Sequence, residues 1–235
     1  MLTKRSFARL LKGVLGEKLY ADLRRRSLTL QSNRRAFTEI YERQLWGYSE
    51  SVSGVGSTLE GSRSIGNALP QVLHDLGAQS LIDAGCSDFS WMRTVDLPGI
   101  KYIGVDVVSD LIERNRRAYG REDRSFLVAD ITKDRLPAAD VVLCRHCLIH
   151  LTNKQVSMAL RNFKRNGIGY LITTSFPSLD RNTDIWPGSF RPLNLEAAPF
   201  NLPKPLRVIG DSAPGEDQTS VLGLWRLSQL KTLRS

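Results

Sequence analysis

The stretch SLIDAGCSDFSW, residues 80–91, begins as a short apolar segment that predicts a buried β-strand. Asp83 stands near the end of this strand, and Gly85, Cys86 and Asp88 follow in the turn. A strand that runs into a glycine turn is typical of the first unit of an α/β sheet, where ligands bind beyond the carboxyl ends of the strands. The two acids in this turn therefore bear directly on what the chain binds.

Downstream of this stretch, short apolar segments alternate with amphipathic ones, which predicts βαβ units and a mostly parallel sheet. We expect an α/β, doubly wound, seven-stranded sheet with a Rossmann-like arrangement. The expected strands are 80–84, 102–106, 125–130, 139–144 and 169–176, with 205–210 and 221–227 as a closing hairpin. The expected helices are 34–47, 65–77, 87–95, 108–119 and 153–165, and the Ser/Gly-rich segment 49–62 predicts a mobile loop.

The composition is that of a soluble globular protein, with 235 residues, 41% hydrophobic residues and 24% charged residues. No apolar run approaches the length of a membrane span, so the sequence predicts no transmembrane helix. The chain has three cysteines, a small and odd number that does not suit a disulfide framework. This favours a reducing, cytoplasmic location. The net charge of +9 is concentrated in residues 1–35, where ten Lys or Arg face two acids, so nucleic-acid binding by the main domain is disfavoured.

We expect two parts, a basic amphipathic helical extension over 1–45 and the main domain over 46–235. Apolar residues of the extension recur at helical spacing between Lys and Arg. Three interpretations of this arm remain: a helix that packs on the main domain or on a second subunit, a peripheral contact with an anionic membrane or glycolipid, and a cleaved organellar presequence. The first of these would allow an oligomer.

Acids recur at the ends of three successive predicted strands, namely Asp83, Asp106 and Asp130. An acid at the second strand end suits ribose hydroxyls, and one at the third can accept from the adenine amine. A phosphate cradle avoids negative charge, so Asp83 and Asp88 argue against a pyrophosphate. They favour an adenosine ligand with an ammonium and a sulfonium, S-adenosyl-L-methionine. Each acid taken alone also suits a helix cap.

With these residues in place, the chain resembles the class I S-adenosylmethionine-dependent methyltransferases over about residues 46–228. Within them it is similar to a bacterial group whose first motif runs Asp-Ala-Pro-Cys-Gly-Asp-Phe-x-Trp-Met. The matching segments here are DAGCSDFSWM, YIGVD, ADIT, LCRHCLIHL, RPLNL and LGLW.

The resemblance implies a donor site, with S-adenosyl-L-homocysteine as product, and a lid made of SVSGVGS and Trp46. The residues implied for the donor are Trp46, Asp83, Gly85, Asp88, Trp91, Asp106, Val107, Asp130, Ile131 and Arg145. The chain departs from the pattern at Ser87 and Phe89, where the superfamily has small residues. It also has His146 where the narrower group has Asp, so the identity of the catalytic base stays open.

His146 and His150 follow the fourth predicted strand, and a histidine is the natural base for a hydroxyl acceptor. We therefore expect one or both to act as acid, base or acceptor-positioning group, although His150 also suits a buried structural role. Cys144, Cys147 and these histidines crowd one turn with no second cysteine pair elsewhere, which makes a poor zinc site. No metal is predicted.

The segment 180–195 follows the fifth predicted strand and carries Asp184, Trp186, Arg191 and Asn194 as candidate acceptor-binding residues. Polar and aromatic side chains suit a hydroxylated, sugar-like acceptor, and Arg191 could hold a carboxylate or phosphate. The alternative, held equal, is that RPLNL is a structural turn whose arginine caps carbonyl groups.

The leading interpretation is a methyltransferase that acts on a hydroxyl or amine of a small-molecule or carbohydrate-like acceptor. The alternatives are an RNA or protein methyltransferase guided by the basic arm, and a non-catalytic member of the fold. A nicotinamide-dependent dehydrogenase is disfavoured because no Gly-x-Gly-x-x-Gly follows the first strand.

Overall fold

A computed structural model describes residues 32–211 and 220–230 of the chain. Seven strands form one sheet, in the order β3-β2-β1-β4-β5-β7-β6. The strands are β1 (Ser80–Ala84), β2 (Lys101–Asp106), β3 (Arg124–Val128), β4 (Val141–Cys144), β5 (Tyr170–Ser175), β6 (Arg207–Gly210) and β7 (Val221–Arg226). The first five are parallel, and β7 pairs antiparallel with both β5 and β6. The predicted doubly wound sheet and its closing hairpin are confirmed.

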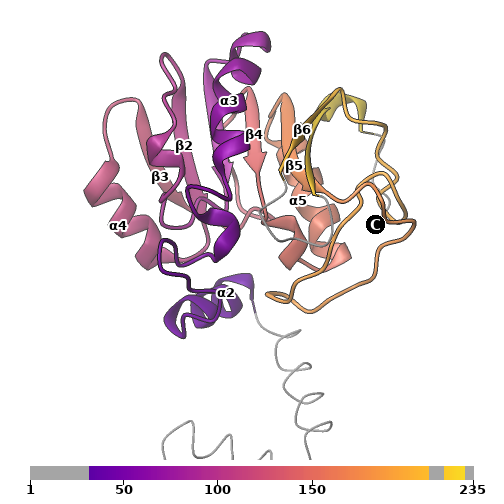
Figure 1. The fold of residues 1–235 in the computed structure, drawn as a ribbon, viewed down its shortest axis with the longest axis horizontal. Helices are drawn as coiled ribbons and strands as arrows, with labels where there is room; N and C mark the ends of the chain where they lie inside the picture. Colours follow the sequence, from indigo (N-terminus) through magenta and orange to yellow (C-terminus); the bar gives the residue numbers. More distant parts are fainter. Residues whose placement is uncertain (1–31, 212–219, 231–235) are drawn as a thin grey trace, which may run out of the picture.

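Four α-helices accompany the sheet in the described part of the chain: α2 (Asn33–Glu42), α3 (Arg63–Asp75), α4 (Ser109–Tyr119) and α5 (Asn153–Arg165). Short 3₁₀ turns occur at η1 (Val55–Ser57), η2 (Met92–Thr94), η3 (Leu148–His150) and η4 (Leu227–Gln229). In Figure 1, α2 lies beyond the ends of the strands, near α4, and α3 crosses a face of the sheet. The predicted amphipathic arm over residues 1–31 lies outside the described residues.

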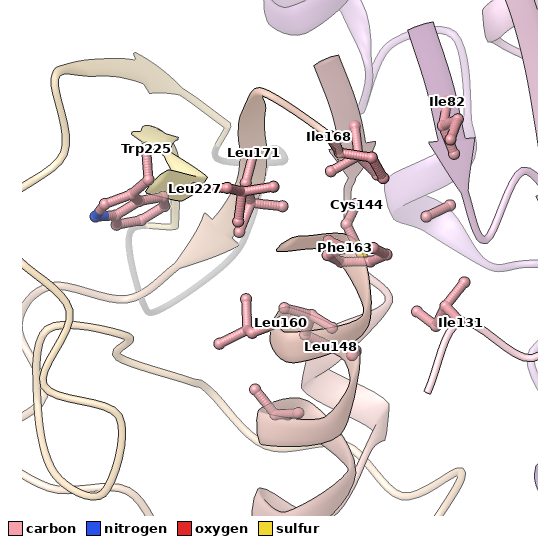
Figure 2. Close-up of a cluster of buried hydrophobic side chains, with 14 of the residues drawn as sticks. Ile82, Ile131, Cys144, Leu148, Leu160, Phe163, Ile168, Leu171, Trp225 and Leu227 are labelled. Atoms are coloured by element: carbon pink, nitrogen blue, oxygen red, sulfur yellow. The ribbon is translucent and has the colours of Figure 1, made fainter. Parts of the chain in front are cut away.

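The two faces of the sheet bury separate apolar cores, because successive strand residues point to opposite sides. On one face, Phe163 and Leu160 of α5 pack with Ile82, Cys144 and Trp225 (Figure 2). The other core is formed by apolar residues of α3 and α4 with the alternate strand residues. Because helices cover both faces, the sheet is fully buried in its centre and the ends of its strands are left to form a site.

The expected helix over 87–95 is wrong apart from one 3₁₀ turn, η2. Ser87 and Phe89 have φ angles of 48° and 58°, in the left-handed region that an α-helix cannot include. The turn therefore needs a backbone conformation that glycine adopts most easily. Two carboxylates stabilise this turn: Asp106 accepts a hydrogen bond from the backbone N–H of Ser87, and Asp88 accepts one from that of Ser90.

Among the described residues, no helix combines the length and the apolar character that crossing a membrane requires.

Candidate active site

A cavity of about 400 Å³ opens at the carboxyl ends of β1, β2, β3 and β4. Its lining includes nine of the predicted residues: Trp46, Gly85, Asp106, Val107, Asp130, Ile131, Arg145, His146 and His150. They come from distant parts of the chain, and the parallel pairing of β1 with β2 and β4 brings them to one edge of the sheet. This is where a doubly wound fold places its ligand.

Asp106, the last residue of β2, lines the cavity while both of its oxygens hold backbone N–H groups. Ser87 donates to Oδ2 at 3.1 Å and Val108 donates to Oδ1 at 2.9 Å. Burial raises the pKa of this carboxyl above its usual value, and the N–H groups of Val108 and Ser87 oppose that rise. Each oxygen retains a lone-pair direction, so the carboxylate can accept two further hydrogen bonds, as a ribose diol requires.

Asp130 lies two residues beyond β3 and connects the cavity to α2. Its Oδ1 accepts from the Asn33 side chain at 3.1 Å and from both the backbone and hydroxyl of Thr132, at 3.0 and 2.7 Å. Asn33 in turn accepts from Gln155 of α5 at 2.6 Å. Oδ1 is therefore saturated. Oδ2 lies 3.9 Å from Nζ of the exposed Lys133 and has acceptor directions left for a ligand donor such as an adenine amine.

Asp83 does not line the cavity, which corrects the expectation that its carboxylate faces the ligand. It is 5% exposed and accepts from the Tyr102 hydroxyl at 2.7 Å. Burial raises the pKa of Asp83 to about 7, the Tyr102 hydrogen bond opposes this rise and the charge of Asp106 adds to it. Asp83 therefore lies behind the wall of the site rather than in it.

This shift makes a prediction for stability. In the unfolded chain the pKa of Asp83 is near its ordinary value of 3.8, whereas in the folded protein it is about 7, so rising pH between these values destabilises the fold. The displacement corresponds to roughly 4 kcal/mol. We expect Asp83→Asn to gain stability relative to wild type as pH rises from about 4 to 7, measured by urea unfolding. Asp110→Asn, at an exposed position of α4, should track wild type, and parallel curves for Asp83→Asn and wild type would refute the assignment.

Asp88 also lies outside the cavity lining, and it holds the segment that forms one wall. It accepts from the Ser51 hydroxyl at 3.2 Å and from the Val52 backbone at 3.0 Å. A further hydrogen bond joins the hydroxyls of Ser53 and Ser87. The predicted donor contact of Asp88 is replaced by this structural role, and the segment expected as a mobile loop is tied to the first turn.

Arg145 anchors the same wall from the other side. Its Nη1 donates to the carbonyl of Gly56 at 2.6 Å and its Nη2 to that of Gly61 at 2.8 Å. Its Nε donates to Asp211 at 2.7 Å, and both side chains of this ion pair are almost fully buried. Trp91, predicted to touch the donor, instead lies with its ring 5.5 Å from the Arg145 guanidinium and does not line the cavity. We call residues 52–61 the lid segment.

His146 lines the cavity but faces this anchor. Its Nε2 lies 3.2 Å from the second oxygen of Asp211, an atom that accepts no hydrogen bond from the described residues. A side-chain carbon added at Gly56 would come 2.5 Å from His146 Nδ1, so the lid segment packs directly on the ring. The two ring nitrogens of His146 therefore lie next to Asp211 and to Gly56 of the lid segment.

His150 is placed differently. Its Nδ1 lies 3.0 Å from the carbonyl oxygen of Ser189, and its ring stacks on Trp46 with centroids 4.3 Å apart. A carbonyl only accepts, so Nδ1 carries the hydrogen and Nε2 keeps its lone pair. Burial lowers the pKa of His150 to about 4, and the Ser189 carbonyl opposes this shift. The imidazole is therefore neutral at physiological pH.

The four residues predicted to bind the acceptor do not line the cavity. Arg191 is 3% exposed and donates to the carbonyls of Thr183, Leu148 and Ile149, which is the structural-turn alternative. Asn194 bridges backbone groups of Leu179 and Glu196, and Asp184 accepts from the Asn153 backbone at the start of α5. Trp186 is half-buried outside the cavity. The other three side chains stabilise the loop rather than line the cavity.

The cysteines of the turn are structural. Cys86 and Cys144 are buried, and Cys147 lines the cavity against Gly85, whose φ is 86°. Contact with the Cys147 thiol, together with burial, raises the pKa of the Cys144 thiol well above its usual value. In the part of the chain that the structure describes, no group of three or more His, Cys, Asp or Glu could hold a metal ion.

Sequence reasoning missed three contributors to the site. Residues of α2, namely Asn33, Phe37, Ile40 and Tyr41, line the cavity although we assigned them to a separate extension. Phe190, from the loop that follows β5, also lines the cavity. Asp211 pairs with Arg145, the residue that anchors the lid segment. The one sequence signal for Asp211 is that it directly follows the predicted strand 205–210.

Comparisons with known proteins agree with this geometry. Residues 82–168 match the family model of a methyltransferase domain. No curated protein matches the chain by sequence. Among solved structures, magnesium protoporphyrin IX methyltransferase from Synechocystis PCC 6803 with bound S-adenosylmethionine is 15% identical, with a TM-score of 0.58 and coverage of 83% of this chain and 98% of that one.

Two further structures are similar. The N-methyltransferase NodS from Bradyrhizobium japonicum WM9, in complex with S-adenosyl-L-homocysteine, is 15% identical with a TM-score of 0.59, covering 83% of this chain and 98% of that one. A 1,6-didemethyltoxoflavin-N1-methyltransferase from Burkholderia thailandensis is 16% identical with a TM-score of 0.56, covering 82% and 86%. At these identities the likeness establishes the fold. The chain thus has the Rossmann-like fold of these methyltransferases, and its residues 82–168 match the methyltransferase-domain model.

Proposed function

We propose that this protein is an S-adenosylmethionine-dependent methyltransferase that methylates a hydroxyl or amine of a small molecule. The observation that carries the proposal is the cavity at the strand ends, where Asp106 and Asp130 each keep oxygen acceptors for an adenosine. Among the described residues, Arg145 is the one lining guanidinium, and each of its three nitrogens already donates to Asp211 or to the lid segment. A cationic nucleoside fits this charge pattern better than a pyrophosphate does.

The donor, once bound, supplies an activated methyl group on a sulfonium, and its product is the neutral thioether S-adenosyl-L-homocysteine. The residues of the chain have the tasks of binding, alignment and proton removal. Asp106 and Asp130 bind the nucleoside, and the lid segment excludes water. The short motifs around this site support placement in the narrower bacterial group that the sequence resembles.

Of the two histidines, we assign the base to His150. Its Nε2 has a free lone pair because Nδ1 is committed to Ser189, whereas His146 packs between Asp211 and Gly56. For a hydroxyl acceptor, the oxygen forms a bond to the methyl carbon while the carbon–sulfur bond breaks and its electrons pass to sulfur. The hydroxyl proton moves to Nε2 of His150. Burial disfavours the imidazolium, so the proton is then released to solvent.

Calorimetry tests the proposal. We expect S-adenosylmethionine and S-adenosyl-L-homocysteine each to bind at one site per chain with a dissociation constant in the micromolar range or below. NADH, with its pyrophosphate, should produce no binding heat. If neither adenosine ligand binds, or NADH binds instead, the proposed function is wrong.

A further inference from the structure

Four aromatic side chains that line the cavity contact one another in a row and form one continuous surface. Phe37 contacts Trp46 edge to face at 5.8 Å between centroids, Trp46 stacks on His150 at 4.3 Å, and His150 lies 6.3 Å from Phe190. All four line the cavity. We call these residues the aromatic wall.

The aromatic wall offers very few polar atoms. Its side chains carry Nε1 of Trp46 and Nε2 of His150 as available hydrogen-bonding groups, because Nδ1 of His150 is committed to Ser189. Ile149 and Phe176 extend the lining with apolar surface. A ligand that lies here therefore meets aromatic and aliphatic faces and a single strong acceptor.

Among the described residues, no charged side chain belongs to the aromatic wall. The charged side chains that line the cavity are Asp106, Asp130 and Arg145. The first two lie at the ends of β2 and β3, and every side-chain nitrogen of Arg145 is hydrogen-bonded. Arg191, the other candidate partner for an anionic acceptor, donates its hydrogen bonds to the carbonyls of Thr183, Leu148 and Ile149. A buried anionic group would find no partner here, which is costly.

We infer that the acceptor is an uncharged, planar aromatic or heteroaromatic molecule whose hydroxyl or N–H donates to Nε2 of His150. A monosaccharide also stacks on aromatic rings, but its several hydroxyls would face apolar surface, and each buried hydroxyl without a partner weakens binding by about tenfold. A planar ring with one polar group avoids this cost. The inference rests on the proposed function and narrows the sugar-like acceptor expected from the sequence.

The test uses three probes and keeps the two proposals separate. Binding of S-adenosyl-L-homocysteine to the full chain is measured first, and its absence would contradict the proposed function itself. With that ligand saturating, 2-naphthol, 2-naphthoate and methyl β-glucoside are titrated by calorimetry. We expect 2-naphthol to bind at least about tenfold more tightly than the other two, since an unpaired buried charge or hydroxyl costs more than 1.4 kcal/mol. Equal or tighter binding of the naphthoate or the glucoside would overturn the inference.

Two variants localise the binding. Phe190 and Tyr48 are both exposed aromatics, at 62% and 55%, but Tyr48 does not line the cavity. Phe190→Ala should weaken 2-naphthol binding about 3- to 10-fold, as expected for loss of one aromatic contact, and leave S-adenosyl-L-homocysteine binding unchanged. Tyr48→Ala should change neither. Equal effects of the two substitutions on 2-naphthol would place the probe elsewhere and refute the aromatic wall as its site.

Discussion

Replacing Asp106 with alanine is expected to weaken S-adenosyl-L-homocysteine binding by more than about 100-fold while the chain still folds. The carboxylate retains one acceptor direction on each oxygen, so a ribose diol can donate twice to a charged group. Hydrogen bonds of this kind contribute about 1.5–3 kcal/mol each, and two of them correspond to a factor above 100 in affinity. Calorimetry gives the affinity, and circular dichroism with thermal unfolding reports the fold.

Asp110→Ala is the matched control, because it removes the same charge from an exposed position four residues away in α4. Its affinity should stay within about threefold of wild type, as expected for a surface charge without a direct contact. The two substitutions thus separate a specific contact from the general field of the acids. An Asp106→Ala variant that binds as tightly as Asp110→Ala would show that the adenosine lies elsewhere.

The central strands of the sheet were predictable because they are buried on both faces and read as apolar runs. The same logic placed Asp106 and Asp130 at the cavity, since the carboxyl ends of parallel strands share one edge. Asp83 and Asp88 followed the same pattern yet lie behind the wall. Asp83 lies within β1, and its carboxylate is held by Tyr102 of the neighbouring strand. Asp88 lies in a turn whose backbone angles, such as the positive φ of Ser87 and Phe89, are not determined by composition.

The loop after β5 shows a second limit. Arg191 and Asn194 have the chemistry of ligand-binding residues, but a loop without regular structure leaves many backbone carbonyls and N–H groups to satisfy. These side chains satisfy them, as the contacts of Arg191 with three carbonyls show. Sequence alone gives the donors and acceptors available in such a loop, and the packing decides whether they turn inward or toward a ligand.

Asp211 illustrates the same limit from the opposite side, because its one local signal is its position directly after the predicted strand 205–210. Its carboxylate is fully buried, binds Arg145 through one oxygen and faces His146 through the other. Asp211→Ala would leave the Arg145 guanidinium buried without its ionic partner, which costs about 3–5 kcal/mol. We expect the midpoint of thermal unfolding to fall by roughly 10 °C, given 2–4 °C per kcal/mol for a chain of this size.

Asp75→Ala is the informative comparison, because Asp75 pairs with Arg207 of β6 at 2.8 Å while both side chains remain nearly half exposed. Solvent screens that pair, so its loss should destabilise the fold much less than the loss of the buried pair. The two variants each remove one aspartate from one Arg–Asp pair, and they differ in burial. If Asp211→Ala were no more destabilising than Asp75→Ala, the Arg145–Asp211 pair would not be the buried anchor described above. A large loss of stability accompanied by weaker S-adenosyl-L-homocysteine binding would show instead that the anchor of the lid segment serves both the fold and the site.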